Sequence, residues 1–469
     1  MTRSMRILGS LALIGLIAAV LVQVAGVHAA GGSAKSGQPP FHGHTPRGPL
    51  GVSNTVSTDV GEPAIHPQSV SSSSTTPSFT AADVNAYLLT TSQPEITLVQ
   101  GAHLSIEKVL FVSDSEATQL MQGEDPGLPA NAVVCFVLLK GPFHVQVDLP
   151  PGTPAGADPT ATEVGEVFDG HTGNLLEWGI LDSIPARSPA QPSTQSPAPS
   201  VNGSSRPLAA QLSTQSFAPS ISYNCQATRC YGLNWWPNAV NGAYTFLNWS
   251  PGALFGAGSS IGIVRNAMWV VDKTAQHANS CYVFVSDLPT VCFVEAGIMS
   301  SIVNGSNKTQ LYWADVRPGY TWFEHKGPEI NTVWSTTAID ITIWRAGTIS
   351  SQTSWCPIAG SEWCVDVYSE GDNKDWREIS GRGHTNTMIV SGYQIGLELY
   401  GTSGAVADNM FFEDNQWEAN NGTDWHYQTN SGDPNQYAID YPVDAWWVQV
   451  PAQGNYGGDW TTCITGAGC

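Results

Sequence analysis

Two glutamates, Glu295 and Glu398, stand inside apolar runs whose residues alternate as those of β-strands do. On the same face of each expected strand, a glycine lies two positions away, Gly297 in one run and Gly396 in the other. Such glycines let a substrate backbone come close to the carboxylate. Two carboxylates suit hydrolysis of an amide or a glycoside, one ionised to activate water and one protonated to donate a proton. A buried pair would hold one proton over a span of acidic pH, so we expect activity in acid.

The strands that must position these glutamates fall in the last 250 residues or so, separated by turns rich in Gly, Pro, Asn and Asp. No long helical period competes with the strand pattern. The fold class predicted for residues 222–469 is therefore an antiparallel all-β sandwich, similar to a jelly roll. The expected strands are 261–271, 281–286, 292–299, 310–316, 321–325, 338–345, 364–368, 395–400, 409–414 and 445–450.

Composition divides the rest of the chain of 469 residues into four parts. Residues 1–30 have the charged start and apolar run of a secretory signal peptide; an uncleaved anchor is the alternative. Residues 31–79 and 184–221 are rich in small residues and proline, which predicts a disordered spacer and a Pro/Ser/Gln-rich linker. Residues 80–183 predict a small α+β domain with helices near 80–89 and 115–121 and strands near 106–112, 132–139, 143–147 and 163–168. Its place suggests a pro-segment, and an adhesive or spacer module is the alternative.

Eight of the nine cysteines lie in the last 250 residues, close together in pairs: Cys225 and Cys230, Cys281 and Cys292, Cys356 and Cys364, Cys463 and Cys469. In an exported protein this pattern predicts local disulfides. Cys135 is left over in an apolar run, and we expect a buried thiol there. The chain is thus expected to be secreted, with no membrane association after signal cleavage.

The net charge of −21 and the lack of any basic cluster argue against nucleic acid as a partner. Glu324 and His325 invite a metal interpretation, yet adjacent strand residues point to opposite faces, and no His-Glu-x-x-His spacing exists. We expect neither a metal nor a cofactor.

At the two glutamate strands a family resemblance appears. Val294-Glu295-Ala296-Gly297, with Leu311-Tyr312-Trp313-Ala314-Asp315 and Gly319-Tyr320 after it, resembles the first glutamate strand and Tyr-Trp hairpin of the neprosin-like glutamic endopeptidases. Gly396-Leu397-Glu398-Leu399, with Asn409-Met410-Phe411 downstream, is similar to the second glutamate strand of that family, although Leu397 replaces a glycine.

The resemblance implies a secreted precursor that cleaves polypeptides, often after proline. It makes Glu295 and Glu398 the catalytic pair, and with it we assign Trp313, Asp315 and Tyr400 to substrate binding. The resemblance also implies a polypeptide as partner, including one rich in proline.

Two other functions fit the same residues. Seventeen tryptophans could stack on sugars in a carbohydrate-binding, lectin-like sandwich with an extracellular polysaccharide as partner. A glycosidase is a third option, because two carboxylates about 5 to 10 Å apart also suit that reaction.

Overall fold

The computed structural model describes part of the chain. For some strands in the described ranges it describes the backbone but not every side chain. These ranges are 60–66, 76–91, 96–145, 160–182, 223–224, 229–236, 239–249, 255–256, 263–272, 274, 281, 292–303, 306–330, 338–346, 356, 362–369, 374–381, 386–400, 406–407, 410–418, 425–427, 437–441, 446–449 and 460–464. The chain divides into Met1–Pro39 and Pro40–Cys469, and every described residue belongs to the second unit.

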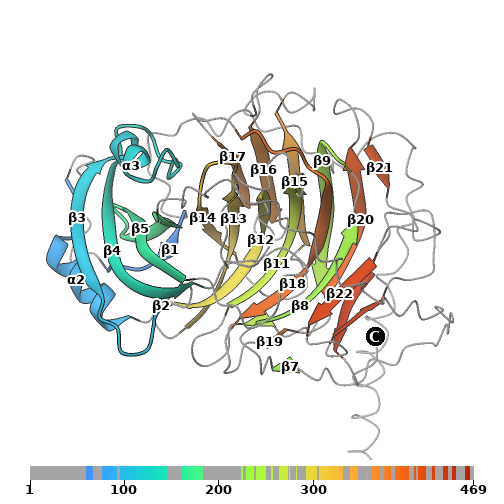
Figure 1. Cartoon of the computed structure of the whole chain (residues 1–469), viewed down its shortest axis with the longest axis horizontal. Coiled ribbons are helices and arrows are strands. Elements are labelled where there is room, and N and C mark those ends of the chain that lie inside the picture. Colours follow the sequence, from blue (N-terminus) through green and yellow to red (C-terminus); the bar gives the residue numbers. More distant parts are fainter. Residues whose placement is uncertain are drawn as a thin grey trace, which may run out of the picture. The chain divides into compact units, whose positions relative to one another are not determined.

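Most strands of the first half of the chain and the two glutamate strands belong to one 13-stranded antiparallel sheet (Figure 1). Its main path runs through β2 (Ile96–Leu98), β4 (Val133–Val145), β5 (Thr160–Asp169), β6 (Asn174–Ile180), β14 (Trp322–Glu329), β13 (Ser306–Val316), β12 (Cys292–Val303), β11 (Ile263–Asp272), β18 (Gly392–Tyr400), β8 (Arg229–Trp236) and β22 (Tyr437–Tyr441). Off this path, β1 (Glu62–Pro63) pairs with β6 and β3 (Ser105–Ser113) pairs with β4.

A second sheet of eight strands forms the other layer of the sandwich, and a small third sheet has three strands. The second sheet follows the order β17 (Lys374–Ser380), β16 (Trp363–Ser369), β15 (Ala338–Arg345), β9 (Gly242–Trp249), β20 (Met410–Glu418), β24 (Trp460–Ile464) and β23 (Trp446–Gln449), with β21 (Trp425–Tyr427) on β20. The third joins β10 (Phe255–Gly256), β19 (Val406–Ala407) and β7 (Tyr223–Asn224). The predicted all-β sandwich is confirmed.

The core between the two large sheets is built from one face of β12 and one face of β15. Val294, Ala296 and Ile298 are fully buried, and they belong to the same apolar cluster as Ile339 and Ile341. Because side chains alternate along a strand, Glu295, Gly297 and Met299 must point to the opposite face of the large sheet. We call this the glutamate face.

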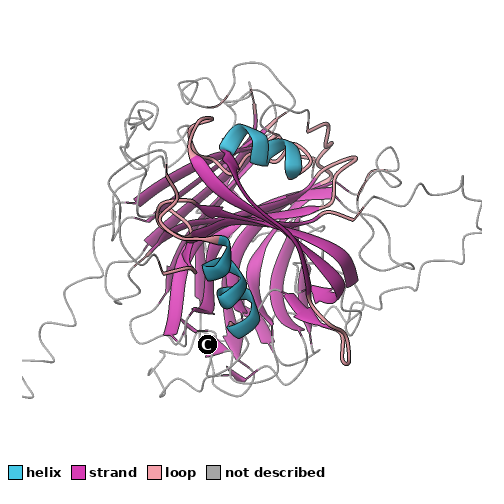
Figure 2. Ribbon diagram, turned by 90° about the vertical axis from the view of Figure 1, so that its left-hand side faces the viewer, coloured by secondary structure: helices cyan, strands magenta, loops and turns pink. Residues whose placement is uncertain are grey.

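The predicted α+β section is present, and its strands continue the sheet of the sandwich. Phe323 to His325 of β14 pair with Gly179 to Glu177 of β6. Figure 2 shows two helices beside the strands; α2 (Ala81–Thr90) contacts β3, and α3 (Asp114–Leu120) contacts β3 and β4. Thr80 caps α2 through a capping box with Asp83, because its hydroxyl accepts the free N–H of the first turn. The runs expected at 132–139 and 143–147 form a single strand, β4, with an irregularity between Lys140 and Phe143.

The expectation of a disordered spacer over 31–79 is wrong for residues 60–66. Glu62 and Pro63 pair with Leu175 and Asn174, and Ile65 is buried. These contacts are made with residues far along the chain, so local composition does not reveal them.

The disulfides Cys281–Cys292 and Cys356–Cys364 form, with Cα atoms 5.2 and 5.9 Å apart, and Cys135 is a buried free thiol. The signal peptide, the linker, the strand expected at 281–286 and the other two cysteine pairs lie wholly or partly outside the described residues. Among the described helices, none has the length and apolar character needed to cross a membrane.

Candidate functional site

Three neighbouring rows of side chains cross the glutamate face, and strand pairing defines each row. The first row runs from Glu295 on β12 to Trp269 on β11 and on to Gln394 on β18. The second contains Gly297, Ala267 and Gly396, and the third contains Met299, Arg265 and Glu398. Every one of these charged and amide side chains is buried. A strip of small residues therefore separates two rows of polar ones.

In the first row Glu295 and Gln394 flank the indole of Trp269. The Trp269 Nε1 donates a hydrogen bond of 2.6 Å to Glu295 Oε2, which fixes the orientation of that carboxylate. Gln394 is fully buried, and among the described residues nothing hydrogen-bonds to its Oε1 or Nε2. A buried amide without a partner is costly, so a group of this kind calls for an explanation.

Glu398 lies in the third row, on the same face as Glu295. It pairs across the sheet with Arg265 of β11. The Cα atoms of Glu295 and Glu398 are separated by two strand spacings, about 10 Å, and by four residues along the strand, about 13 Å, or roughly 16 Å in all. The structure thus brings both glutamates to one face but not into adjacent rows.

The second row keeps its strands closely packed. A Cβ added to Gly297 would come within 2.1 Å of the Asn266 carbonyl oxygen and 2.7 Å of Ala267 Cα. Only glycine therefore fits at position 297. Gly396 occupies the same row on β18, as the alternation of the two glutamate strands predicts.

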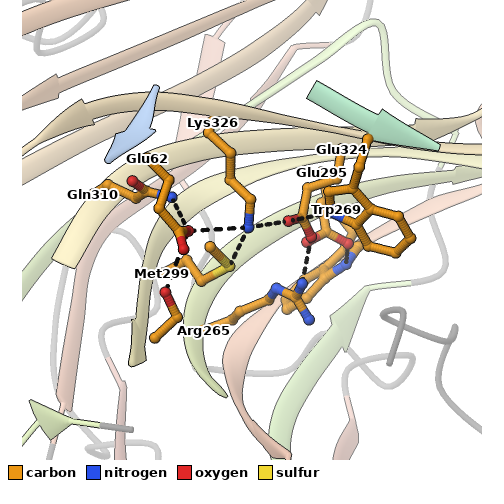
Figure 3. Close-up of polar contacts among 10 residues, drawn as sticks. Glu62, Arg265, Trp269, Glu295, Met299, Gln310, Glu324 and Lys326 are labelled. Atoms are coloured by element: carbon orange, nitrogen blue, oxygen red, sulfur yellow. Dashed lines mark hydrogen bonds and ion pairs between the residues drawn. The ribbon is translucent and has the colours of Figure 1, made fainter. Parts of the chain in front are cut away.

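A chain of buried charges runs beside these rows (Figure 3). Arg265 reaches across the Tyr312 ring, 5.5 Å from its centroid, to pair with Glu324 of β14. The other oxygen of Glu324 accepts hydrogen bonds from Lys326 Nζ at 2.6 Å and from Trp178 Nε1 at 2.9 Å. Burial raises the pKa of Glu324, but Arg265 and Lys326 outweigh this effect and the net pKa is lowered. Glu324 is therefore ionised, and it holds both cations in place.

Glu62 extends the chain of charges from the opposite end of the sequence. Its Oε2 lies 3.6 Å from Lys326 Nζ, 3.1 Å from Gln310 Nε2 and 3.4 Å from Ser301 Oγ (Figure 3). Strand β1 thus places a carboxylate from the first part of the chain on the glutamate face.

The structure contradicts the grouping of Trp313 and Asp315 with Glu295. Ala314, not Trp313, pairs with Glu295, so Trp313 and Asp315 project from the opposite face. The Trp313 ring stacks on His325 at 4.1 Å, and Asp315 accepts a hydrogen bond from Ser380 of the second sheet. Both side chains are buried between the sheets, and they cannot contact a substrate that lies over Glu295. The side chain of Tyr400, the third predicted substrate-binding residue, lies outside the described part of β18.

A second polar cluster surrounds Asp315 on that inner face. Arg317 pairs with Asp315 at 3.2 Å and with Glu124, which also lies 3.4 Å from His325 Nε2. Burial raises the pKa of Asp315 to about 7, with the Ser380 hydrogen bond opposing it, and burial lowers the pKa of Arg317 to about 10.

The neighbouring Glu177 is a buried carboxyl with no hydrogen-bond partner among the described residues. Burial raises its pKa well above the usual value, and the carboxylates of Asp125, Asp114, Asp315 and Glu378 raise it further. Glu177 pairs across the sheet with His325, so both belong to the inner face and not to the glutamate face.

The sequence interpretation missed several residues of the glutamate face. A charged residue inside the apolar run of β11 was a usable signal for Arg265, because a buried cation requires a partner. Gln394, Trp269, Lys326 and Glu62 had no such signal, since their position depends on strand order and register. Within the described ranges, no group of three or more His, Cys, Asp or Glu side chains is placed to hold a metal ion.

Comparisons with known proteins found likenesses in structure alone. No family model and no curated protein matches the sequence. Scytalido-glutamic peptidase, solved with a peptide-based transition state analog, is 9% identical with a TM-score of 0.28 and covers 52% of this chain and 100% of its own. SCP-B, a member of the Eqolisin family solved with the tripeptide Ala-Ile-His, is 7% identical with a TM-score of 0.28 and the same coverage.

Aspergilloglutamic peptidase from Aspergillus niger is 10% identical, with a TM-score of 0.26, and covers 43% of this chain and 98% of its own. These solved structures are glutamic peptidases, but TM-scores this low assign no function to the chain.

Proposed function

We propose that the chain is an exported endopeptidase in which Glu295 activates water for attack on a peptide carbonyl. The expected activity in acid depended on a proton shared with Glu398, whose Cα lies roughly 16 Å from that of Glu295. The observation that carries the proposal is the first row of the glutamate face, where a buried carboxylate and a buried amide without a described partner flank one indole. The Cα atoms of Glu295 and Gln394 are about 10 Å apart across two strand spacings. In this proposal the substrate carbonyl lies over the Trp269 indole, where it would face the ends of both side chains.

In this proposal the two side chains have separate tasks. Ionised Glu295 takes a proton from water as the water oxygen bonds to the carbonyl carbon. The Gln394 Nε2 group donates a hydrogen bond to the carbonyl oxygen as that oxygen becomes negative. The C–N bond then breaks, and the leaving nitrogen receives the proton held by Glu295. Trp269 holds the carboxylate in a fixed orientation throughout.

Glu398 remains the second carboxyl that the family resemblance implies. Its separation from Glu295 is larger than the 3 Å or so over which two carboxyl groups share a proton. We therefore propose that Glu398 acts on the substrate or through Arg265, its neighbour across the strand pair, and not by sharing a proton with Glu295.

The described disulfides support export to an oxidising compartment. On the glutamate face, Trp178 and Trp269 each donate the indole N–H to a glutamate, so their described contacts hold carboxylates in place and give no support to the carbohydrate-binding alternative.

The test is cleavage of a peptide mixture by the purified full chain between about pH 2 and pH 7, followed by mass spectrometry. Glu295→Gln should lower kcat/KM by about 10²- to 10⁴-fold, which is the usual contribution of a general base. Glu329→Gln, at a half-exposed ion pair with Lys308, is the matched control and should keep full activity. Unchanged cleavage by Glu295→Gln would exclude the proposed role.

The same incubation tests processing of the precursor at the linker over 184–221. A cut in that linker in acid, absent in Glu295→Gln, is the expected result. A linker that stays intact over this whole pH range argues against self-processing.

A further inference from the structure

The carboxylate of Glu62, on β1, contacts hydrogen-bond donors that come from other strands of the glutamate face. Ser301 belongs to β12, Gln310 to β13 and Lys326 to β14, and all three reach the same oxygen of Glu62. Alternation along the three strands places these side chains on the face of Glu295. We call Ser301, Gln310 and Lys326 the carboxylate subsite.

The segment that fills this subsite is short. Strand β1 has two residues, and it is held at the edge of β6 by its pairing with Leu175 and Asn174. Ile65 N donates to the Gly173 oxygen at 2.9 Å, and Asn174 Nδ2 donates to the Val60 oxygen at 2.8 Å. A segment with so few backbone hydrogen bonds opens at a lower free energy than the sheet as a whole.

The described contacts of Glu62 favour an anion in the subsite. Its carboxylate accepts hydrogen bonds from Gln310 Nε2 and Ser301 Oγ and lies 3.6 Å from Lys326 Nζ, and all three side chains are buried. Departure of Glu62 removes this shared acceptor. Buried donors that lose an acceptor are costly, so an incoming carboxylate would be bound in its place. Lys326 pairs across the sheet with Tyr312, and Tyr312 pairs with Gly297, so Lys326 lies in the row next to that of Glu295.

We propose that Ser301, Gln310 and Lys326 bind an acidic side chain of a peptide substrate, and that Glu62 occupies this subsite as an internal substitute for that side chain. The ligand is a glutamate or aspartate of an extended peptide. Its identity as a substrate rests on the proposed peptidase function, whereas its binding does not.

The test uses the full chain with a recognition sequence for a specific protease inserted between Ser72 and Ser73, outside the described ranges. Cutting there leaves the segment that carries β1 held only by its noncovalent contacts. A fluorescent, C-terminally amidated peptide of residues 58–66 is then added in excess, and its binding is followed by polarisation. The comparison peptide differs only by Glu62→Gln.

The cut protein should bind the comparison peptide roughly 10- to 100-fold more weakly than it binds the native peptide, because the hydrogen bonds to a charged group are lost. Lys326→Met in the protein should cause a similar loss for the native peptide only. Lys308→Met, on the same sheet but paired with Glu329, is the matched control and should bind both peptides as the parent does. Because the peptide change leaves the protein intact, it decides the question even where Lys326→Met fails to fold.

Equal binding of the two peptides, or no exchange of the segment after cutting, overturns the subsite. Peptide cleavage, measured separately from binding, tests the proposed peptidase activity independently of the carboxylate subsite. An active enzyme whose peptide products show a Glu or Asp preference, lost in Lys326→Met, supports the proposal. Tight binding of the native peptide without cleavage of any peptide contradicts the peptidase function and leaves the carboxylate subsite standing.

Discussion

Gln394 has a buried amide whose oxygen and nitrogen have no described hydrogen-bond partner. Replacing such a group with an apolar side chain of similar size removes an unsatisfied desolvation cost. Gln394→Leu should therefore raise the free energy of unfolding by about 1–3 kcal/mol while it abolishes the peptidase activity that we propose. Urea unfolding and a peptide cleavage assay on the same preparation measure both effects.

Gln310→Leu is the control for that experiment, because the Gln310 amide does donate a hydrogen bond to Glu62. This variant should be less stable than the parent. A Gln394→Leu variant that is also destabilised would mean that the amide is bonded in solution, and it would weaken the proposed role of Gln394.

Glu177 predicts a pH dependence of stability. Its pKa is raised in the folded state, chiefly by burial, so the folded chain binds this proton more tightly than the unfolded chain does. The free energy of unfolding should then fall as pH rises above the unfolded value of about 4.3. Asp315, with a pKa raised to about 7, adds to the same trend up to neutrality.

Glu177→Gln should flatten part of this slope, with a gain in stability at pH 7 and none at pH 3, where both forms are protonated. Denaturant unfolding at a series of pH values measures it. Glu107→Gln, at an exposed position of β3, provides the same substitution on the surface as the comparison. The contribution of Glu177 is the difference in free energy of unfolding between Glu177→Gln and the parent at each pH. A difference that does not grow between pH 4 and pH 7 would contradict the raised pKa of Glu177.

At the scale of elements, the β6–β14 pairing depends on Gly179. A Cβ at this position would come within 2.3 Å of Phe323 Cδ1 and 3.0 Å of the Trp322 carbonyl oxygen. Gly179→Ala should therefore lower Tm by several degrees, because the two strands must separate or the Phe323 ring must move. Thermal unfolding by circular dichroism measures the shift.

Gly141→Ala in β4 is the matched substitution, since a Cβ there has contacts no closer than 3.2 Å. Its effect should be clearly smaller. Equal shifts for the two variants would show that the close approach at Gly179 relaxes without cost.

The sequence predicts which residues of one strand share a face of the sheet, but it does not predict which residues of different strands lie in one row. Alternation within a strand correctly puts Glu295 with Gly297, and Gly396 with Glu398, because the two-residue period is local. The row of Glu295, Trp269 and Gln394 depends on β11 lying between β12 and β18, which are far apart in sequence. The error for Trp313 has the same origin, because a register that pairs Ala314 with Glu295 sends its neighbours to the other face.

At the scale of the whole molecule, the large sheet contains a single described free thiol. Cys135 is fully buried in β4, and burial raises its pKa to about 12, with Glu166 adding to the rise. Because the thiolate is the reactive form, iodoacetamide should not modify Cys135 in the native protein. Peptide mapping should detect the modification only after unfolding, and modification under native conditions would mean that β4 opens readily.

The chain's first strands and its sandwich share one set of backbone hydrogen bonds where β6 meets β14. If proteolysis ever released the section before the linker, the N–H and C=O groups of Phe323 to His325 would lose their partners and β14 would become an open edge. Such an edge accepts any extended chain of suitable sequence. Such a cut would thus create a docking place for a foreign strand on β14, the strand that carries Glu324 and Lys326.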